Sequence, residues 1–339
     1  MFPFELINYC SFENGIKVML LNKHLYKNIN VGYFNYKLYQ KNLYNIKIKN
    51  IKILYDYSVG TMNISHLINL EKFSHWRYSV MHQNNFNKLT KLIKFECDNI
   101  NLVSVNHMFN LKKLICHHRL GINVNGIKKV TKISTLRCNY KKIVNVNHLS
   151  NLKKLDCGDA SGINQTGISC LTKLVMLNCN SNRKIIDVNH LINLKKLYCG
   201  GSSGLSQIGI RCLTKLNTLN CSYNTKIFNV NHLENLKNLC CFYSSTINQN
   251  GIQYLKKITR LECSFNNKIT DVNHLINLKV LMCHGHINLD QKGISKLTNL
   301  MELNCMYNDK IIDVSHLVNL KILLHKGSGI VQVPTRLKN

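Results

Sequence analysis

Histidine and cysteine, two residue types that bind metal ions and serve as general bases or nucleophiles, recur at fixed intervals along this sequence. Residues 187–199 read DVNHLINLKKLYC, and residues 271–283 read DVNHLINLKVLMC. Seven histidines follow one another at steps of 41 or 42 residues: His66, His107, His148, His190, His232, His274 and His316. Whether this spacing builds a metal or catalytic site depends on the elements that hold these residues.

A second phrase alternates with the histidine phrase. It reads GISCLTKLVMLNC over residues 167–179, and similar phrases begin at Gly209 and Gly293. Each long period therefore contains two units, and both units contain the pattern LxxLxC. Short self-similar units of this kind cannot bury an apolar face alone and predict a solenoid of stacked units.

The unit resembles that of leucine-rich repeat proteins, LxxLxLxxN followed by spaced aliphatic residues, with cysteine in place of the third leucine. Leu174, Leu177 and Cys179 match this pattern, and Asn182 takes the asparagine position. The continuation IIDVNHLINL is similar to internalin-like short repeats, whereas INQTGISCLTKL resembles units of cysteine-class repeats. The resemblance implies an α/β solenoid, an arc with a parallel concave β-sheet and short convex helical or 3-10 segments.

The cysteine position counts the rungs of this predicted solenoid. It gives about fourteen rungs over residues 51–326: Asp56, His75, Cys97, Cys116, Cys138, Cys157, Cys179, Cys199, Cys221, Cys241, Cys263, Cys283, Cys305 and His325. Because successive side chains of a strand point to opposite faces, we expect the leucines and cysteines to face the core. We expect an asparagine such as Asn182 to satisfy buried backbone groups where the strand ends.

Eleven of the fifteen cysteines occupy this inward position. A metal site would need about four ligands converging on one ion, at about 2.3 Å for sulfur. Strands of neighbouring rungs lie about 4.8 Å apart in a row, and a row does not converge. Cysteine also packs as a small apolar residue. We therefore expect reduced, metal-free thiols that serve the core.

The repeated histidines follow asparagine or serine, which are good helix N-cap residues. We expect each histidine to begin a short convex turn or 3-10 segment, two rungs from the next histidine, so that no single metal ion joins them. The sequence also lacks a phosphate-binding loop, an H-E-x-x-H motif and a nucleophile elbow. We expect no enzymatic activity, no catalytic residue, no metal and no cofactor.

The formal net charge of +29 has two explanations. Such a charge suits nucleic acid, an anionic membrane or an acidic partner. The abundance of Lys, Asn, Ile and Tyr equally suits an AT-rich genome. No apolar run approaches the roughly 18 residues that span a bilayer, and the N-terminus lacks a cationic flank. We therefore expect a protein of the cytoplasm or nucleus that does not insert into membranes.

The outward strand positions provide the candidate binding surface, because solenoids bind partners along extended concave faces. They are basic in the first rungs and become apolar toward the C-terminus. The candidate contact residues are Lys113, Lys154, Lys196, Tyr198, Val280, Met282, Ile322 and Leu324. This gradient favours a protein partner with an acidic stretch and an apolar anchor. Nucleic acid is the rival ligand, with few arginines and aromatic residues on the face to read bases.

Residues 1–50 precede the repeats and resemble the start of an F-box. The residues that carry this resemblance are Pro3, Glu5, Leu6 and Ile7, followed by LLNKHL over residues 20–25. The resemblance implies binding to a Skp1-type adaptor and a role as substrate receptor of a cullin ubiquitin ligase. The alternative is a helical N-terminal cap, and residues 327–339 are expected to form a C-terminal cap or tail. The composition and organisation resemble those of leucine-rich repeat proteins of giant DNA viruses of amoebae, which would make the compartment that of a host cell.

Overall fold

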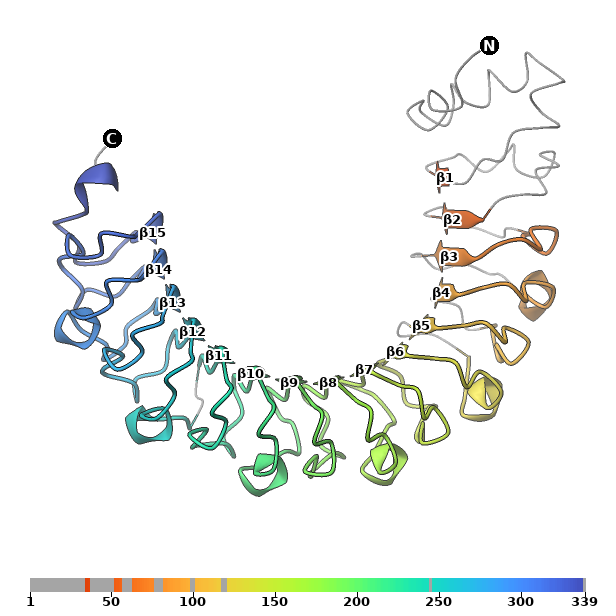
Figure 1. The fold of residues 1–339 in the computed structure, drawn as a ribbon. Helices are drawn as coiled ribbons and strands as arrows, with labels where there is room; N and C mark the ends of the chain where they lie inside the picture. The colour runs from red at the N-terminus through yellow and green to blue at the C-terminus, as the bar shows by residue number, and fades with distance from the viewer. Residues whose placement is uncertain are drawn as a thin grey trace, which may run out of the picture. The chain divides into compact units, whose positions relative to one another are not determined.

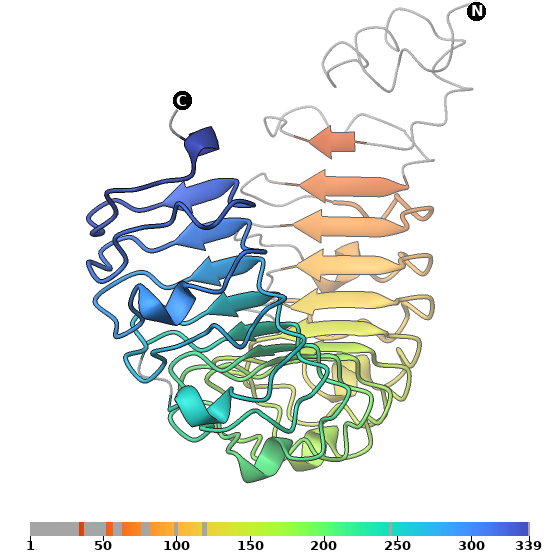
Figure 2. The same cartoon turned by 60° about the vertical axis from the view of Figure 1, so that its left-hand side comes forward.

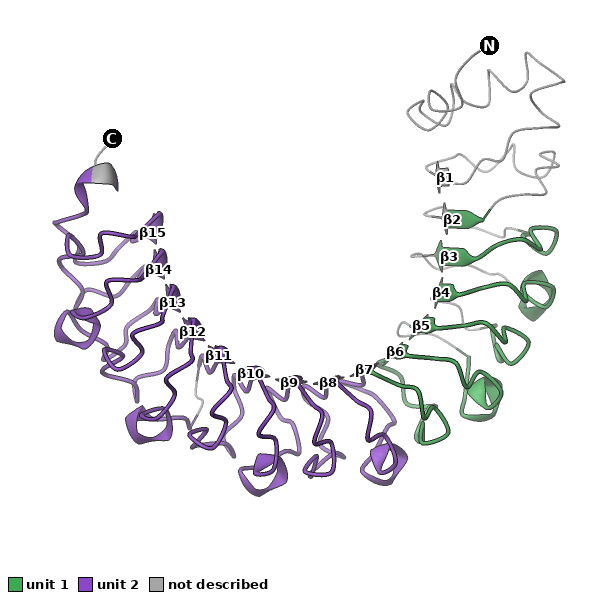
Figure 3. Ribbon diagram, in the orientation of Figure 1, with its two compact units in different colours: residues 1–153 green, residues 154–339 purple. Residues whose placement is uncertain are grey.

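The structure, a computed structural model, describes residues 34–36, 52–56, 63–75, 82–97, 101–116, 121–243 and 246–337. The chain divides into two compact units, residues 1–153 (unit 1) and residues 154–339 (unit 2), which are coloured green and purple in Figure 3. Both units consist of short parallel strands joined by turns and single-turn 3-10 helices (Figure 1).

Unit 1 contains six of these strands, each paired in parallel with the next one along the chain. They are β1 (Phe34–Tyr36), β2 (Ile53–Asp56), β3 (Lys72–His75), β4 (Lys94–Cys97), β5 (Lys113–Cys116) and β6 (Thr135–Cys138). Among the residues of this unit that the structure describes, the 3-10 helices are η3 (Gln83–Asn85) and η4 (Asn125–Ile127).

Unit 2 continues the pattern with nine parallel strands. They are β7 (Lys154–Asp156), β8 (Met176–Asn178), β9 (Lys196–Tyr198), β10 (Thr218–Asn220), β11 (Asn238–Cys240), β12 (Arg260–Glu262), β13 (Val280–Met282), β14 (Glu302–Asn304) and β15 (Ile322–Leu324). Its 3-10 helices are η5 (Thr166–Ile168), η6 (Ile208–Ile210), η7 (Gln249–Gly251), η8 (Lys292–Ile294) and η9 (Thr335–Leu337). Within each unit the strands lie side by side and point in one direction (Figure 2).

The predicted solenoid is confirmed, and strands β2 to β15 coincide with the fourteen predicted rungs. Strand β1 is one more rung, which sequence analysis did not find. It pairs with β2 so that Phe34 is in register with Leu54 and Tyr36 with Asp56. The segment escapes the motif search because Phe34 and Tyr36 take the places of leucine and cysteine.

The core lies behind the strands and consists of the predicted inward residues. In β9, Leu197 is fully buried between the exposed Lys196 and the half-buried Tyr198. The eleven inward cysteines are all buried, as predicted. In unit 1 the rings of Phe73, Phe86 and Phe95 meet at centroid distances of 5.4 to 5.9 Å. Each rung therefore buries its apolar face against its neighbours, because stacking removes that face from water.

The predicted role of the repeated asparagines is also confirmed. The Nδ2 atom of Asn182 donates to the carbonyl oxygens of Cys157 at 2.9 Å and Ile163 at 3.0 Å, while its Oδ1 accepts from the Lys184 amide. Asn224, Asn266 and Asn308 make hydrogen bonds of the same kind. Because an unpaired buried backbone group is costly, each of these buried amides stabilises the place where a strand turns away from the sheet.

Candidate functional site

The repeated histidines bind the backbone of the preceding rung. In six of the seven, Nε2 lies 2.8 to 3.3 Å from a carbonyl oxygen 21 or 22 residues earlier. His190, for example, reaches the carbonyl of Ile168, at the end of η5. Each of the seven histidines lies in a turn, as predicted, and in these six the ring links two rungs. This arrangement accounts for the histidine spacing without a metal ion.

The predicted N-cap role of the preceding asparagines is wrong. Asn189 accepts from the Cys212 amide and donates to the Ile208 carbonyl, both of the following rung. Its own turn is capped by Asp187, whose Oδ1 accepts from the Asn189 amide at 2.7 Å. The Asn189 side chain therefore pairs with two backbone groups of the next rung instead of its own turn, and a single sequence does not reveal partners 19 to 23 residues away.

The inward cysteines form a row of buried thiols without disulfide bonds rather than a convergent site. Burial raises the pKa of Cys179 and of Cys263 to about 12, so these thiols stay protonated at neutral pH. Among the described residues, no group of three or more His, Cys, Asp or Glu side chains could hold a metal ion. These cysteines therefore act as small apolar residues that pack the core.

The outward face of the unit 2 strands carries two lines of side chains in register. The first line, in strand order, is Lys154, Met176, Lys196, Thr218, Asn238, Arg260, Val280, Glu302 and Ile322. The second line is Asp156, Asn178, Tyr198, Asn220, Cys240, Glu262, Met282, Asn304 and Leu324. All predicted contact residues of unit 2 therefore lie on one sheet face.

The apolar residues at the C-terminal end of this face form two separate pairs. Val280 and Met282 belong to β13, and Ile322 and Leu324 belong to β15. Strand β14 lies between them and presents Glu302 and Asn304. The sequence predicts a face that becomes apolar toward the C-terminus, and the pairing register shows that its apolar residues form two sites with a polar strand between them.

A shallow pocket of about 430 Å³ lies at the edge of the same face, where strands β13 to β15 begin. It is lined by Asn277, Lys279, Asn299, Met301, Asn319 and Lys321. Met301 precedes Glu302 of the polar strand, and its side chain is half-exposed. This methionine, which sequence analysis missed, adds an apolar group between two lysines beside the apolar pairs.

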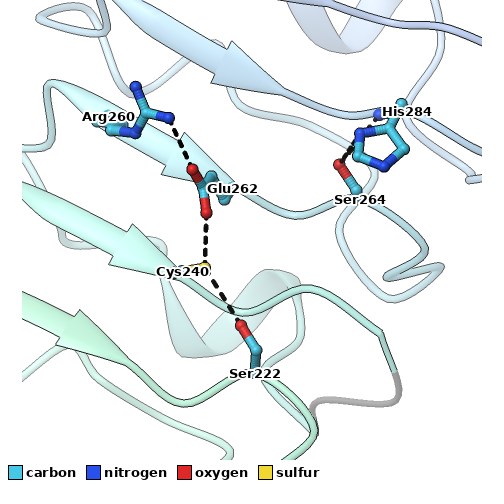
Figure 4. A network of polar contacts seen from close by, with 6 residues as sticks. All are labelled: Ser222, Cys240, Arg260, Glu262, Ser264 and His284. Carbon is cyan, nitrogen blue, oxygen red and sulfur yellow. Dashed lines mark hydrogen bonds and ion pairs between the residues drawn. The ribbon is translucent and has the colours of Figure 1, made fainter. Parts of the chain in front are cut away.

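A network of polar side chains lies in the middle of the face, on strands β11 and β12 (Figure 4). Cys240 Sγ donates to Glu262 Oε2 at 2.7 Å and lies 3.2 Å from Ser222 Oγ. Arg260 Nη2 donates to Glu262 Oε1 at 2.7 Å. Beside this network, Ser264 Oγ lies 2.7 Å from Nδ1 of His284.

The electrostatics of the network make Cys240 a hydrogen-bond donor. Burial, followed by the hydrogen bond to Glu262, raises the pKa of the Cys240 thiol. Burial alone would raise the pKa of Glu262, but hydrogen bonds from Cys240 and Arg260 outweigh it and hold that pKa below 4.5. A nucleophilic cysteine needs a lowered pKa. The arrangement therefore holds a protonated thiol against a carboxylate and presents a fixed polar surface.

Lys113, the remaining predicted contact residue of the repeats, lies in unit 1. It is half-exposed on β5 and is in register with Lys94 of β4. Lys94 forms an ion pair with Glu96 at 3.1 Å, and Glu96 is almost fully buried and also accepts from Ser74 Oγ at 3.0 Å. Part of the basic character of this face is therefore neutralised within it.

Aromatic side chains that sequence analysis missed line the rim where the unit 2 strands end. Tyr223, Tyr243, Phe265 and Tyr307 each lie two residues after an inward cysteine and are 37 to 49% exposed. They have φ between 50° and 61°, a left-handed conformation that is uncommon outside glycine. The signal available in the sequence was the recurrence of Tyr or Phe two residues after these cysteines.

The F-box-like residues Pro3, Glu5, Leu6 and Ile7 lie outside the described residues. In the part of the chain that the structure describes, no helix is long and apolar enough to cross a lipid bilayer.

Comparison with known proteins finds solved structures of similar fold. No family model matches the chain, and no curated protein matches its sequence. The functional domain of InlJ from Listeria monocytogenes, which includes a cysteine ladder, superposes with a TM-score of 0.59 and 20% identity, covering 80% of this chain and 61% of that domain. A leucine-rich repeat protein of Leptospira interrogans gives a TM-score of 0.58 and 18% identity, with 93% of both chains covered. TLR13 in complex with ssRNA13 gives 0.54 and 16% identity, covering 83% of this chain and 51% of TLR13.

The parallel strands, the buried LxxLxC positions and these structural neighbours together define the fold of leucine-rich repeat proteins. The chain spans 61% of the length of the InlJ domain that it resembles.

Proposed function

We propose that the outward face of strands β7 to β15 in unit 2 binds a protein partner, without enzymatic chemistry. The observation that carries this proposal is that this face varies strongly from rung to rung, whereas the inward positions of the same strands do not. The inward positions repeat leucine and cysteine because every rung provides the same environment. The first outward line of β9 to β15 instead reads Lys196, Thr218, Asn238, Arg260, Val280, Glu302 and Ile322.

The turns outside the sheet contrast with this variety. The VNHLINL phrase places an exposed isoleucine at both Ile192 and Ile276, which are 55% and 62% exposed. These exposed apolar residues recur because the phrase itself is repeated, so exposure alone does not identify a binding site. Specific recognition requires a surface that differs from its surroundings, and the outward strand positions have that property.

The chemistry of the face suits a protein with apolar side chains and an acidic segment. Tyr198, Met282 and Ile322 offer apolar area on rigid backbone, and such anchors carry most of the energy of an interface. Lys154 and Lys196 are exposed on the earlier strands of the same unit and would attract acidic groups. Repeat proteins of this architecture use extended surfaces for binding, which supports the proposal.

The experiment compares two variants. Met282→Glu with Ile322→Glu should abolish protein capture, because a charge would have to be buried without a partner. Lys154→Glu with Lys196→Glu should mainly slow association and change its salt dependence. Both variants are measured against the protein captured by the wild type and against RNA and DNA at low and physiological salt.

If the ligand were nucleic acid, the two variants would show the opposite order of effects on binding. Neutralisation of phosphates by lysine supplies most of the affinity for nucleic acid, so the lysine variant would lose binding and the apolar variant would keep it. Recruitment of a Skp1-type adaptor through Pro3, Glu5, Leu6 and Ile7 is a separate proposal. It is tested by binding of purified adaptor to the full chain and to a Pro3→Ala, Leu6→Ala variant.

A further inference from the structure

Three aromatic rings on the rim of unit 2 stack on one another in strand order. The ring centroids of Tyr223 and Tyr243 are 4.8 Å apart at 12°, and those of Tyr243 and Phe265 are 4.5 Å apart at 19°. Phe242 meets Tyr223 edge-on at 5.4 Å and Tyr243 at 5.7 Å. We call these three stacked rings the ring ladder. Since each rung adds one ring at the spacing of the strands, the ladder is a rigid stacking platform.

The ladder position is the second residue after the inward cysteine or histidine of a rung, and in three other rungs it is a glycine: Gly201, Gly285 and Gly327. A neighbouring ring covers two of these glycines. A Cβ atom added to Gly285 would lie 2.4 Å from Cε1 of Phe265, and one added to Gly327 would lie 2.7 Å from Cδ1 of Tyr307. The rings therefore lean toward the following rung. Tyr223, which begins the ladder, leans in the same way toward Tyr243.

Gly201 differs from these two glycines. It lies in the ladder position one rung before Tyr223, and the residue before it in the same line is Ser181. The nearest atom to an added Cβ is Ser181 Oγ at 2.6 Å, so a small hydroxyl takes the place that a ring takes elsewhere. The place beside the first face of Tyr223 is therefore left without a ring of the protein.

A pocket of about 660 Å³ opens at this place. Its lining includes Arg183, Gly201, Ser202, Tyr223 and Lys226. Both cations are exposed, and the described residues of the lining include no Asp or Glu. Pockets of about 300–1,000 Å³ are typical of small-molecule sites. The pocket therefore combines a stacking surface, hydroxyl groups and two positive charges.

We propose that this pocket, which we call the Gly201 pocket, binds a nucleoside phosphate. The base stacks on the first face of Tyr223, in the place that a ring at position 201 would take, and so extends the ring ladder by one rung. The phosphate is bound by Arg183 and Lys226, whose charges approach from neighbouring rungs on either side of residues 201–203. Lys226 Nζ already lies 3.4 Å from the carbonyl oxygen of Ser203, which holds its charge over the pocket. An aromatic side chain of a protein would fill less of the volume and would leave the cations unpaired.

The nucleotide comes either free or as part of a single strand of nucleic acid, and the chemistry of recognition is the same. The pocket lies on the rim and shares no residue with the contact residues proposed for protein binding. Failure of nucleotide binding would therefore leave the protein-binding proposal standing, and the reverse also holds.

The test measures binding of AMP and of adenosine to the full chain by calorimetry, and of a short single-stranded oligoadenylate by fluorescence anisotropy. Tyr223→Leu should weaken AMP binding about 5- to 150-fold, the range measured for loss of one base-stacking ring. Tyr223→Phe keeps the ring and should keep binding. Tyr307→Leu, a matched change in the same line away from the pocket, should leave binding unchanged.

Two further changes test the other parts of the pocket. Arg183→Gln with Lys226→Gln should reduce binding of AMP to the level of adenosine. Gly201→Tyr should place the chain's own ring in the pocket and abolish binding. Its Cβ atom requires a shift of Ser181 Oγ, so circular dichroism checks that the fold is kept. Tighter binding of oligoadenylate than of AMP would identify a strand as the source, and the opposite order a free nucleotide. Absence of AMP and oligoadenylate binding, equal losses in Tyr223→Leu and Tyr307→Leu, or equal affinity for adenosine and AMP would overturn the proposal.

Discussion

Val280 and Ile322 lie on one line of the unit 2 sheet, with Glu302 in register between them. Two strand spacings of about 4.8 Å separate their backbones by roughly 10 Å. The two side chains are therefore independent apolar sites rather than one continuous patch. A partner that uses both must present two apolar groups at that separation, with a polar group facing Glu302.

Independence of these sites predicts additive losses of affinity. Val280→Ala and Ile322→Ala should each weaken binding of the captured partner, and the double variant should lose the sum of the two free energies to within about 0.5 kcal/mol. Titration calorimetry with the purified partner measures the three values. A double variant no weaker than the worse single variant would mean that both residues contact one shared apolar group.

The assignment of inward and outward strand positions predicts unequal effects on stability. Leu197 is fully buried, so Leu197→Ala should lower the free energy of unfolding by about 2 to 5 kcal/mol. Its exposed neighbour in β9 is Lys196, and Lys196→Ala should cost less than about 0.5 kcal/mol. Urea denaturation followed by circular dichroism compares them, and similar losses would contradict the assignment.

His232, which links two rungs, predicts a loss of stability in mild acid. Burial lowers the pKa of His232 below 6.5, and the hydrogen bond to the Ile210 carbonyl offsets this only in part. The unfolded chain then binds more protons than the folded chain near this pKa, so the free energy of unfolding falls as the pH drops below about 6.5. His232→Gln should lose less stability than the wild type between pH 7.5 and pH 5.5. A matched change at the exposed His325 should leave the wild-type pH dependence, and an equal dependence in all three proteins would refute the mechanism.

The cysteine row predicts selective thiol reactivity. Cys170 and Cys212 are exposed and should react first with a thiol reagent, whereas the buried cysteines such as Cys179 should react only after unfolding. In denaturant nearly all fifteen thiols should titrate. Stoichiometric zinc in elemental analysis of the native protein would contradict a row that serves packing.

The inward-facing residues of the strands were predictable because every rung has the same packing requirement. Leu197 and Cys199 repeat at a fixed spacing since each rung must bury the same face, and the period of two fixes which side chains point inward. Strand β1 was missed because Phe34 and Tyr36 keep the geometry but change the residue types.

Features that join different rungs could not be read from the sequence. The Asn189 clamp depends on Ile208 and Cys212, and the ring ladder depends on side chains 20 to 22 residues apart that meet only after stacking. The polar strand β14 likewise divides the apolar residues only once the register is known. Contacts of this kind follow from the neighbouring rung rather than from the local pattern.

The central claim is that protein recognition lies on the outward strand face of unit 2 and nowhere on its turns. The most direct measurement is quantitative affinity capture with the full chain, comparing Met282→Glu with Ile322→Glu against a control that carries Ile192→Glu with Ile276→Glu. The control residues are at least as exposed as Ile322, which is 50% exposed, but they lie in the repeated turns. The account predicts that the strand variant loses the captured protein and that the turn variant retains it at the wild-type level. Retention by the strand variant with loss by the turn variant would contradict the claim.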